Sequence, residues 1–222
     1  MTAKARQGTR RRLGADARRA QILRLAGDMF SKDGTDATSM RRIATKAGVT
    51  ATLLYKYFAD KDALLMAIGD EFFVKLAAAM HETVGTERDP IARLKAMMRT
   101  YVTCGIENPR EYHLTFMTAL PGLSRGDEMK AFRERARRGK TIAEADITVG
   151  MKCFSQLEHA VGDVVRAGLT RTKDVAALAE AVWASGHGLV SLVITHDNFG
   201  FTEPKRLVEV SLDLTLNGLL KR

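Results

Sequence analysis

Apolar residues recur every three or four positions along most of this chain, which is the period of an α-helix. The first such stripe, ending before Gly34, predicts a helix over about residues 16–32 and consists of Ile22, Leu25, Ala26, Met29 and Phe30. Further stripes and capping signals predict helices over about residues 61–83, 90–106, 141–167, 172–196 and 204–219. Another helix is expected to open at Asn108-Pro109, with Glu111 in the capping-box position. No segment alternates with the period of a strand, so the pattern predicts an all-α fold.

Two shorter helices are predicted within TSMRRIATKAGVTATLLYKYFADKDALL, residues 38–65. Thr38 or Ser39 is suited to cap the first, whose apolar positions are Met40, Ile43, Ala44 and Ala47. Gly48 suits the left-handed end of that helix, and Thr50 is suited to cap a second helix over 51–58. In the second helix we expect Leu54 and Phe58 to face inward, with Leu53 and Tyr57 on an adjacent inward stripe. Two helices joined in this way form a helix-turn-helix, which places one helix in the DNA major groove.

Positive charge is concentrated at one end of the chain. Residues 1–58 hold 13 lysines and arginines against four aspartates, which accounts for the whole net charge of +9. The rest of the chain holds 22 basic and 22 acidic residues. Clustered positive charge is the electrostatic footprint of a nucleic-acid site, so the larger, neutral part is expected to have another task.

Residues 1–15 are predicted to be a disordered basic arm without an acidic residue. Two interpretations remain for it: an arm that contacts phosphates or the minor groove, or a solvated tail. Its basic residues are Lys4, Arg6, Arg10, Arg11 and Arg12. Two interpretations also remain for the charged segment 124–140: a mobile loop or an exposed helix.

Several classes of protein are disfavoured. The two cysteines, Cys104 and Cys153, form no CxxC motif, so neither a disulfide framework nor a zinc site is expected, and a reducing cytoplasm fits. No run of 18 apolar residues or secretory signal is seen, so neither a membrane span nor export is predicted. Sequence motifs of hydrolases, P-loop proteins, metalloproteases and dinucleotide enzymes are absent, and we expect no enzyme activity, cofactor or metal. The histidines show no ligand spacing; they are His81, His113, His159, His187 and His196.

The helix-turn-helix segment resembles the DNA-binding domain of the TetR family of bacterial regulators over residues 16–66. The block Leu54-Tyr55-Lys56-Tyr57-Phe58 followed by Lys61 is the most discriminating part of the match. The resemblance implies phosphate contacts for Ser39, Thr50, Tyr55, Tyr57 and Lys61, and a base or phosphate contact for Arg41. Outward positions of the second helix that are suited to base contacts are Ala51, Thr52 and Lys56. Since the family often has Gly or Pro where this chain has Thr52, its base preference cannot be transferred.

The second half resembles one subclass of the same family. Its motifs are Trp183-Ala-Ser-Gly-His187-Gly188-Leu189 and, upstream, Asn108-Pro109 to Met117. The resemblance implies a homodimer in which the last two helices of each subunit pack as four, with Gly186 and Gly188 allowing close approach. The alternative is that these residues close the core of the monomer. The candidate interface residues are Val182, Leu189, Leu192, Val193, Leu207, Val210 and Leu214.

A binding pocket for a largely apolar or aromatic effector is expected in the middle of this half. Its candidate lining residues are Met97, Met98, Tyr101, Tyr112, Phe116, Met117, Phe154, Trp183 and His187. Methionines suit a cavity that must adapt its shape.

We therefore expect a basic arm over 1–15, a DNA-binding domain over 16–60 and an effector-binding and dimerisation domain over 61–222. The predicted function is that of a cytoplasmic, nucleoid-associated regulator that binds a palindromic operator, most simply a repressor released by its effector. An activator or an effector-independent regulator is the alternative within this class. A nonspecific nucleoid-associated protein is the rival from a different class.

Overall fold

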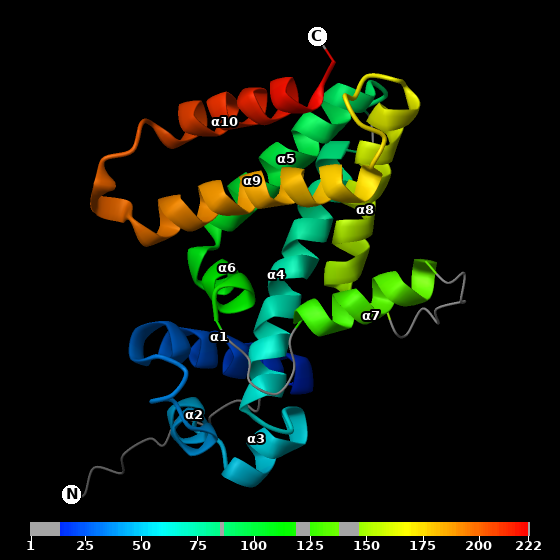
Figure 1. Ribbon diagram of the computed structural model, residues 1–222. Coiled ribbons are helices and arrows are strands. Elements are labelled where there is room, and N and C mark those ends of the chain that lie inside the picture. The colour runs from blue at the N-terminus through cyan, green and yellow to red at the C-terminus, as the bar shows by residue number, and fades with distance from the viewer. Residues whose placement is uncertain (1–13, 85–86, 119–124, 138–146, 222) are drawn as a thin grey trace, which may run out of the picture. The chain divides into compact units, whose positions relative to one another are not determined.

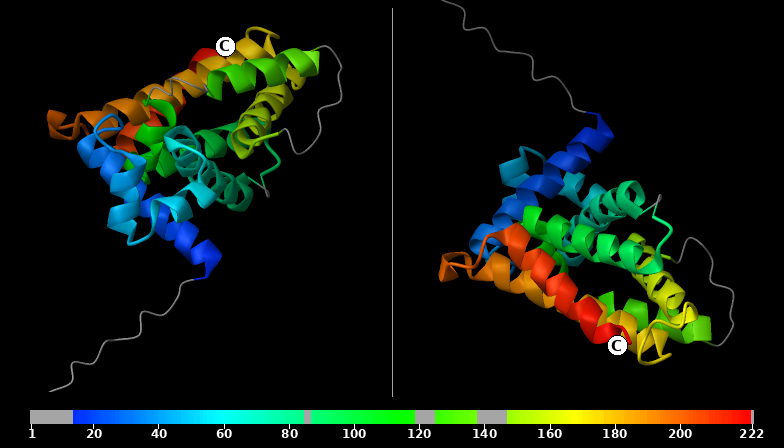
Figure 2. Two further views of the ribbon diagram at one scale, coloured as in Figure 1. Left: turned by 90° about the horizontal axis from the view of Figure 1, so that it is seen from below. Right: turned by 90° about the horizontal axis from the view of Figure 1, so that it is seen from above.

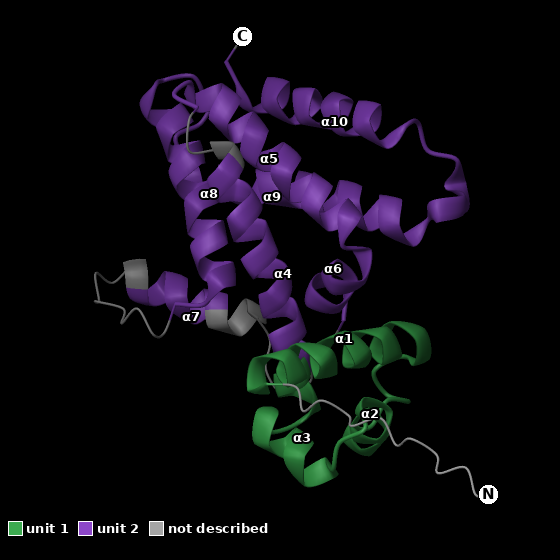
Figure 3. Ribbon diagram, turned by 180° about the vertical axis from the view of Figure 1, so that it is seen from behind, with its two compact units in different colours: residues 1–64 green, residues 65–222 purple. Residues whose placement is uncertain are grey.

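The computed structural model describes residues 14–84, 87–118, 125–137 and 147–221 (Figure 1). The described residues form helices, with one isolated β-bridge between Thr170 and Leu220. The fold is all-α, as the period of the apolar residues predicts. The chain divides into two compact units, residues 1–64 and 65–222 (Figure 3).

The first unit contains α1 (Ala15–Asp33), α2 (Met40–Ala47) and α3 (Ala51–Tyr57). Its buried side chains come from the apolar stripes of these helices and from the first turn of the next; they are Ile22, Leu23, Ala26, Phe30, Met40, Ile43, Ala44, Ala47, Leu54, Phe58 and Leu64. Leu53 is exposed, which contradicts its predicted inward orientation. A seven-residue helix buries only one narrow face, and Leu54 occupies it.

Local side-chain chemistry fixes the turn between α2 and α3. Ser39 caps α2 by accepting a hydrogen bond from the Arg42 N–H at 3.3 Å. Gly48 ends α2 at φ +65°, and the N–H of the following Val49 bonds the Ala44 carbonyl at 3.0 Å. Thr50 then caps α3 by accepting from the Leu53 N–H at 3.1 Å. Thr38, the other candidate cap, is buried and its hydroxyl donates to the Met29 carbonyl.

The longest helix, α4 (Lys61–Val84), begins in the first unit and continues into the second. Asp60 caps it by accepting from the Ala63 N–H at 2.7 Å. The division between the units falls after Leu64 rather than after Asp60, because the first turn of α4 clusters with the helix-turn-helix.

In the second unit α5 (Pro90–Glu107) is the central helix. It packs against α6 (Pro109–Phe116), α8 (Val149–Arg166), α9 (Val175–Thr195) and α10 (Pro204–Leu219). Helices α9 and α10 run side by side in opposite directions and are joined by a connection containing η2 (Asp197–Phe199) (Figures 1 and 2). The core draws on α4, α5, α6, α8, α9 and α10; its largest fully buried side chains are Phe72, Leu76, Leu94, Val102, Tyr112, Val161 and Leu212.

Helix boundaries in this unit differ from prediction at several places. Segment 124–140 contains a helix, α7 (Arg125–Arg137), so the helical alternative is correct there. Helix α8 begins at Val149 behind a Thr148 cap, and part of the longer helix predicted from residue 141 lies outside the described residues. The helix predicted from residue 172, with Thr172 as its expected cap, begins later: Asp174 caps α9, and the Thr172 hydroxyl accepts from the Asp174 N–H.

The predicted capping box at the start of α6 is wrong. Asn108 makes no side-chain cap; its amide nitrogen donates back to the Cys104 carbonyl at 2.9 Å. Glu111 lies instead beside two cations, Arg110 and Lys75. These charges bind the carboxylate more strongly than a backbone N–H does, and Asn108 is occupied elsewhere.

The crossing of α5 and α9 is closely packed at Gly105. A Cβ atom built on Gly105 would lie 2.8 Å from Val190 Cγ1 and 2.9 Å from the Tyr112 ring. Gly186 on α9 likewise approaches the Tyr101 ring, at 3.3 Å from an added Cβ. The close approach predicted for Gly186 therefore occurs within the chain.

Helix α9 is the one described helix that is long and apolar enough to cross a membrane, with 21 residues and a mean hydropathy of 1.4. This is weak evidence for a span, because helices at the core or interface of a protein have the same composition. Its buried residues Ala179, Val182, Gly186 and Val190 recur at helical spacing, as in a helix packed on a protein body.

Candidate nucleic-acid interface and effector cavity

Helix α3 presents a polar, uncovered face. Thr50, Thr52, Tyr55 and Lys56 are exposed, Tyr55 by 50%, whereas Ala51 is half-buried. Leu54 and Phe58 anchor the opposite face, and the Arg19 guanidinium of α1 lies 5.3 Å from the centre of the Phe58 ring. Apart from Lys56, these exposed side chains carry hydroxyl groups, and the two threonines near the start of the helix are short, so this end can approach a groove closely.

The two capping hydroxyls retain a hydrogen-bonding capacity after capping. Ser39 and Thr50 each accept from a backbone N–H, so the proton of each hydroxyl remains available for donation. Both residues are exposed at helix N-termini, where partial positive charge favours a phosphate. Capping and phosphate binding are thus compatible in one side chain.

The remaining predicted DNA contacts differ in their surroundings. Arg41 is exposed. Tyr57 is half-buried, its ring centre 6.4 Å from that of Phe58. Lys61 Nζ donates to the Thr35 carbonyl at 2.9 Å, which fixes the lysine but leaves two of its N–H groups for a phosphate. Arg42, which no sequence pattern indicated, binds the Asp33 carboxylate at 2.8 Å and the Ala37 carbonyl. The predicted arm residues Arg6, Arg10, Arg11 and Arg12 lie outside the described residues.

A cavity of about 720 Å³ occupies the second unit between α4, α5, α6, α7, α8 and α9. Six of the nine candidate lining residues border it: Met97, Met98, Tyr101, Phe116, Phe154 and Trp183. The contribution of α4 and α7 was not predictable, because an apolar stripe does not reveal which core residues border a void. The residues missed include Phe73, Leu76, Met80, Met129, Arg133, Cys153 and Leu157.

Three predicted pocket residues do not border the cavity. Tyr112 is fully buried behind Tyr101, with the two hydroxyl oxygens 2.8 Å apart. The Tyr112 hydroxyl also lies 2.7 Å from His187 Nδ1, so His187 is a partner of the tyrosine rather than a lining residue. Met117 follows α6 and is exposed away from the lining.

Burial suppresses ionisation of the polar groups at this site. It raises the pKa of Tyr101 to about 12, although hydrogen bonds with Tyr112 and Trp183 lower it. Burial also raises the pKa of Tyr112 and lowers the pKa of His187. Cys153 on the cavity wall has its thiol pKa raised by burial to about 11. All four groups are therefore neutral near pH 7, and the thiol is not an activated nucleophile.

The charged groups on the wall are balanced. Arg133 binds Glu158 at 3.0 Å and Glu180 at 2.5 Å, and its guanidinium lies 5.3 Å from the centre of the Phe154 ring. Lys130 and Glu134 lie beside it on α7. The described wall thus carries two basic and two acidic side chains, so it has no net charge and favours an uncharged ligand over an ion.

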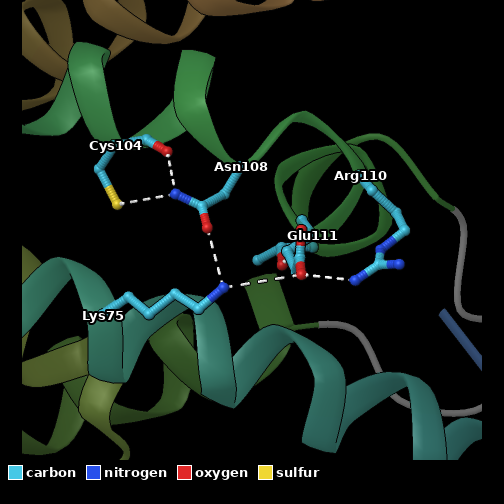
Figure 4. A network of polar contacts seen from close by, with 6 residues as sticks. Lys75, Cys104, Asn108, Arg110 and Glu111 are labelled. Atoms are coloured by element: carbon cyan, nitrogen blue, oxygen red, sulfur yellow. Dashed lines mark hydrogen bonds and ion pairs between the residues drawn. The ribbon is translucent and has the colours of Figure 1, made fainter. Parts of the chain in front are cut away.

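A polar network ties α4 to the start of α6 (Figure 4). Lys75 of α4 donates to Asn108 at 2.8 Å and lies 3.7 Å from the Glu111 carboxylate, which also binds Arg110 at 2.8 Å. Burial alone raises the pKa of Glu111, but the hydrogen bond from Arg110 and the charges of Arg110 and Lys75 outweigh it and lower that pKa. The network is therefore strongest when Glu111 is ionised.

Replacing Glu111 by glutamine is expected to lower the free energy of unfolding by about 1–3 kcal/mol near neutral pH, because a charge-assisted contact is lost. A lowered folded-state pKa gives stability above the unfolded-state pKa that is lost as pH falls through the folded-state pKa. The difference between wild type and E111Q should therefore shrink below about pH 4.5. Urea unfolding across this range measures it, with the exposed Glu82→Gln as control. A difference independent of pH would contradict the assignment.

The outer faces of α9 and α10 carry an uncovered apolar stripe. Leu192, Val210 and Leu214 are exposed, whereas Leu189, Val193 and Leu207 are half-buried. Val182, predicted at the dimer interface, is buried and borders the cavity, so its assignment to an exposed interface is wrong. Helix α10 buries a second stripe against its own unit, namely Val208, Leu212, Leu216 and Leu219.

Family comparisons match both units. The family described as "Bacterial regulatory proteins, tetR family" matches residues 22–68, and "Tetracyclin repressor-like, C-terminal domain" matches residues 94–216. Among the described residues, no group of three or more His, Cys, Asp or Glu side chains is arranged to hold a metal ion.

Two curated relatives are named as transcriptional regulators. The chain is 32% identical over 111 residues to the transcriptional activator FasR of Mycolicibacterium smegmatis, covering 49% of this chain and 51% of that protein. It is 33% identical over 82 residues to the transcriptional repressor KstR2 of Mycobacterium tuberculosis, covering 37% and 41%. The matched part thus spans about half or less of each relative.

Solved structures share the fold across nearly the whole chain. The fatty acid degradation regulator FadR of Bacillus halodurans has a TM-score of 0.70 at 16% identity, over 96% of this chain and all of that one. The ketosteroid transcriptional regulator KstR2 of Mycobacterium tuberculosis has a TM-score of 0.61 at 20% identity, over 94% and 98%. At these identities the likeness establishes the fold alone.

Proposed function

Because this chain belongs to the TetR family of bacterial regulatory proteins, we propose that it is a homodimeric repressor released from a palindromic operator by a small, largely apolar effector. The family assignment makes it a DNA-binding transcriptional regulator of helix-turn-helix type. The homodimer, the direction of regulation, the effector and the operator symmetry are the proposed part.

One observation carries the effector mechanism: a single helix serves both units. Helix α4 begins at Lys61 beside the helix-turn-helix, and further along it supplies Phe73, Leu76 and Met80 to the cavity wall. A ligand that fills the cavity contacts this helix directly. If two arrangements of α4 differ in ligand affinity, occupancy shifts the population between them and alters the spacing of two paired reading helices.

The dimer follows from the apolar stripe on α9 and α10 and from the needs of DNA binding. One short reading helix binds DNA weakly, whereas two held one helical turn apart, about 34–36 Å, bind a palindromic site together. Only 22% of the most apolar 18-residue stretch of α9 is buried within the chain. A second copy that packs its own α9 and α10 on this face would cover the remainder.

Activation is the alternative, because the relatives include both kinds of regulator: FasR is named an activator and KstR2 a repressor. Selection of bound duplexes from a random DNA pool at near-physiological salt tests the main proposal. We expect a palindrome with half-sites about one turn apart. Enrichment of no sequence, combined with a steep salt dependence, would favour a nonspecific nucleoid-associated protein instead.

The exposed hydroxyls of α3 are proposed to have separate tasks. Tyr55→Phe removes a proposed phosphate contact and is expected to weaken all operator variants alike, by about three- to tenfold. Thr52→Ala removes a proposed base contact and should change the ranking of the variants. Fluorescence anisotropy against a panel of single-base operator variants measures both. Identical behaviour of the two substitutions would refute this division.

A further inference from the structure

A chain of hydrogen bonds runs from the cavity wall into α9. Trp183 Nε1 donates to Tyr101 Oη at 3.0 Å, and Tyr101 Oη lies 2.8 Å from Tyr112 Oη. Tyr112 Oη lies 2.7 Å from His187 Nδ1, and His187 Nε2 lies 3.4 Å from Ser191 Oγ. Trp183 and Tyr101 border the cavity, whereas Tyr112 and His187 do not. We call these five residues the polar chain.

The donors of the polar chain can be assigned in two ways. An indole N–H only donates, and a neutral imidazole carries one proton on one of its two nitrogens. Burial lowers the pKa of His187, so its ring is neutral near pH 7. The two arrangements therefore correspond to the two neutral tautomers of this one ring.

In the first arrangement His187 is protonated on Nε2. Tyr101 donates to Tyr112, Tyr112 donates to Nδ1, and Nε2–H donates to Ser191, so the one proton left over is that of the Ser191 hydroxyl. Ser191 is only half-buried, so water can accept this proton, and no donor is left facing the cavity. In the second, His187 is protonated on Nδ1 and donates to Tyr112. Tyr112 then donates to Tyr101, and the Tyr101 proton is left for the cavity. An empty or purely hydrocarbon-filled cavity favours the first arrangement, because an unpaired buried donor costs free energy.

Other hydroxyls on the wall do not compete for this role. Thr115 donates to the Glu111 carbonyl at 2.6 Å, and Thr118 donates to the His113 carbonyl at 3.3 Å. Arg133 is bound by Glu158 and Glu180. Among the described lining residues, Tyr101 is therefore the hydroxyl whose proton can be redirected without breaking a backbone contact.

We propose that Tyr101 determines effector specificity by donating to a carbonyl-type oxygen of a neutral, mostly apolar effector, and that this reverses the polar chain and moves the His187 proton from Nε2 to Nδ1. The inference rests on the proposed effector cavity and adds the chemical class of its ligand. Because His187 lies on α9, binding of the polar group of the ligand changes the hydrogen bonding of a residue on α9. The same helix carries the exposed residue Leu192.

Two isosteric probes test the specificity: 1-phenylhexan-1-one and 2-phenylhept-1-ene, in which a methylene group replaces the carbonyl oxygen. Calorimetric titration of the full chain should give about tenfold tighter binding of the ketone, the usual scale of one net hydrogen bond. Tyr101→Phe should bind both probes alike, at the affinity of the alkene. Equal affinities in the wild type, or no binding of the ketone, would overturn the proposal.

Nitrogen-15 spectra of the His187 ring at pH 7.5 test the reversal. The ketone should move the ring from the Nε2–H to the Nδ1–H tautomer, and the alkene should not. Tyr112→Phe interrupts the polar chain, so this variant should still prefer the ketone while His187 no longer responds. An unchanged tautomer in the wild type, or a response that persists in Y112F, would exclude the mechanism. Neither the calorimetric titration nor the nitrogen-15 spectra involve DNA. If the proposed operator binding is refuted, these results are therefore unaffected.

Discussion

Glutamate at both Leu192 and Leu214 is expected to yield a monomer that binds the operator at least about 100-fold more weakly than the wild type. These side chains are 52% and 69% exposed, so the fold of one subunit does not depend on them. Burial of a leucine contributes about 1.5–3 kcal/mol, and each substitution occurs twice in a symmetric dimer. Four carboxylates placed in an apolar interface add a cost of desolvation and repulsion.

Weakened operator binding follows because the two reading helices are no longer linked. The second half-site then binds from bulk solution instead of at a high effective concentration. Sedimentation equilibrium and anisotropy on the selected operator measure the two effects together. Val74→Glu on α4, another exposed apolar residue at 55% exposure, is the matched control and should remain dimeric. A double variant that stays dimeric would place the interface elsewhere.

Gly105→Ala is expected to lower the free energy of unfolding by about 1–3 kcal/mol, as overpacking of a tight core does. The direction of this change in stability is diagnostic, because alanine in place of glycine within a helix ordinarily stabilises a protein by about 1 kcal/mol. Here the added methyl group would lie 2.8 Å from Val190 and 2.9 Å from Tyr112, where ordinary carbon contacts need about 3.5–4.0 Å.

A double-mutant cycle isolates this contact. Val190→Ala removes the nearest side-chain atom, so G105A should cost less in a V190A background than in the wild type. Thr103→Ala, at an exposed position of the same helix, serves as the neutral control in urea unfolding. Additive effects of G105A and V190A would show that the crossing of α5 and α9 has room to adjust.

Local features were predictable from sequence where one residue determines the outcome. Gly48 takes the left-handed conformation and Thr50 caps α3, since the chemistry of each turn depends on a few neighbouring atoms. Prediction failed where two neighbouring residues suit the same role. Thr172 and Asp174 are both competent caps, and the choice between them depends on where α9 meets the body.

Features of the cavity required tertiary structure. The sequence pattern predicts Val182 at the interface and Tyr112 in the pocket, whereas Val182 borders the cavity and Tyr112 does not. Helical spacing assigns a residue to a face of its helix but does not show what packs against that face. The contact between Tyr112 and His187 joins residues 75 positions apart, and no local pattern reveals it. The aromatic residues and methionines of α5, α6, α8 and α9 on the wall could be proposed from sequence, whereas the charged side chains of α7 could not, since no pattern indicates that α7 borders the cavity.

Trp183 is the single tryptophan of the chain, and it stands on the cavity wall with its N–H bound to Tyr101. Selective excitation of the indole therefore reports on one position per subunit, without any attached dye. A molecule that enters the cavity changes the polarity around this ring, and with it the emission maximum and intensity. The protein thus carries its own optical sensor, with which a library of unlabelled compounds can be screened in solution.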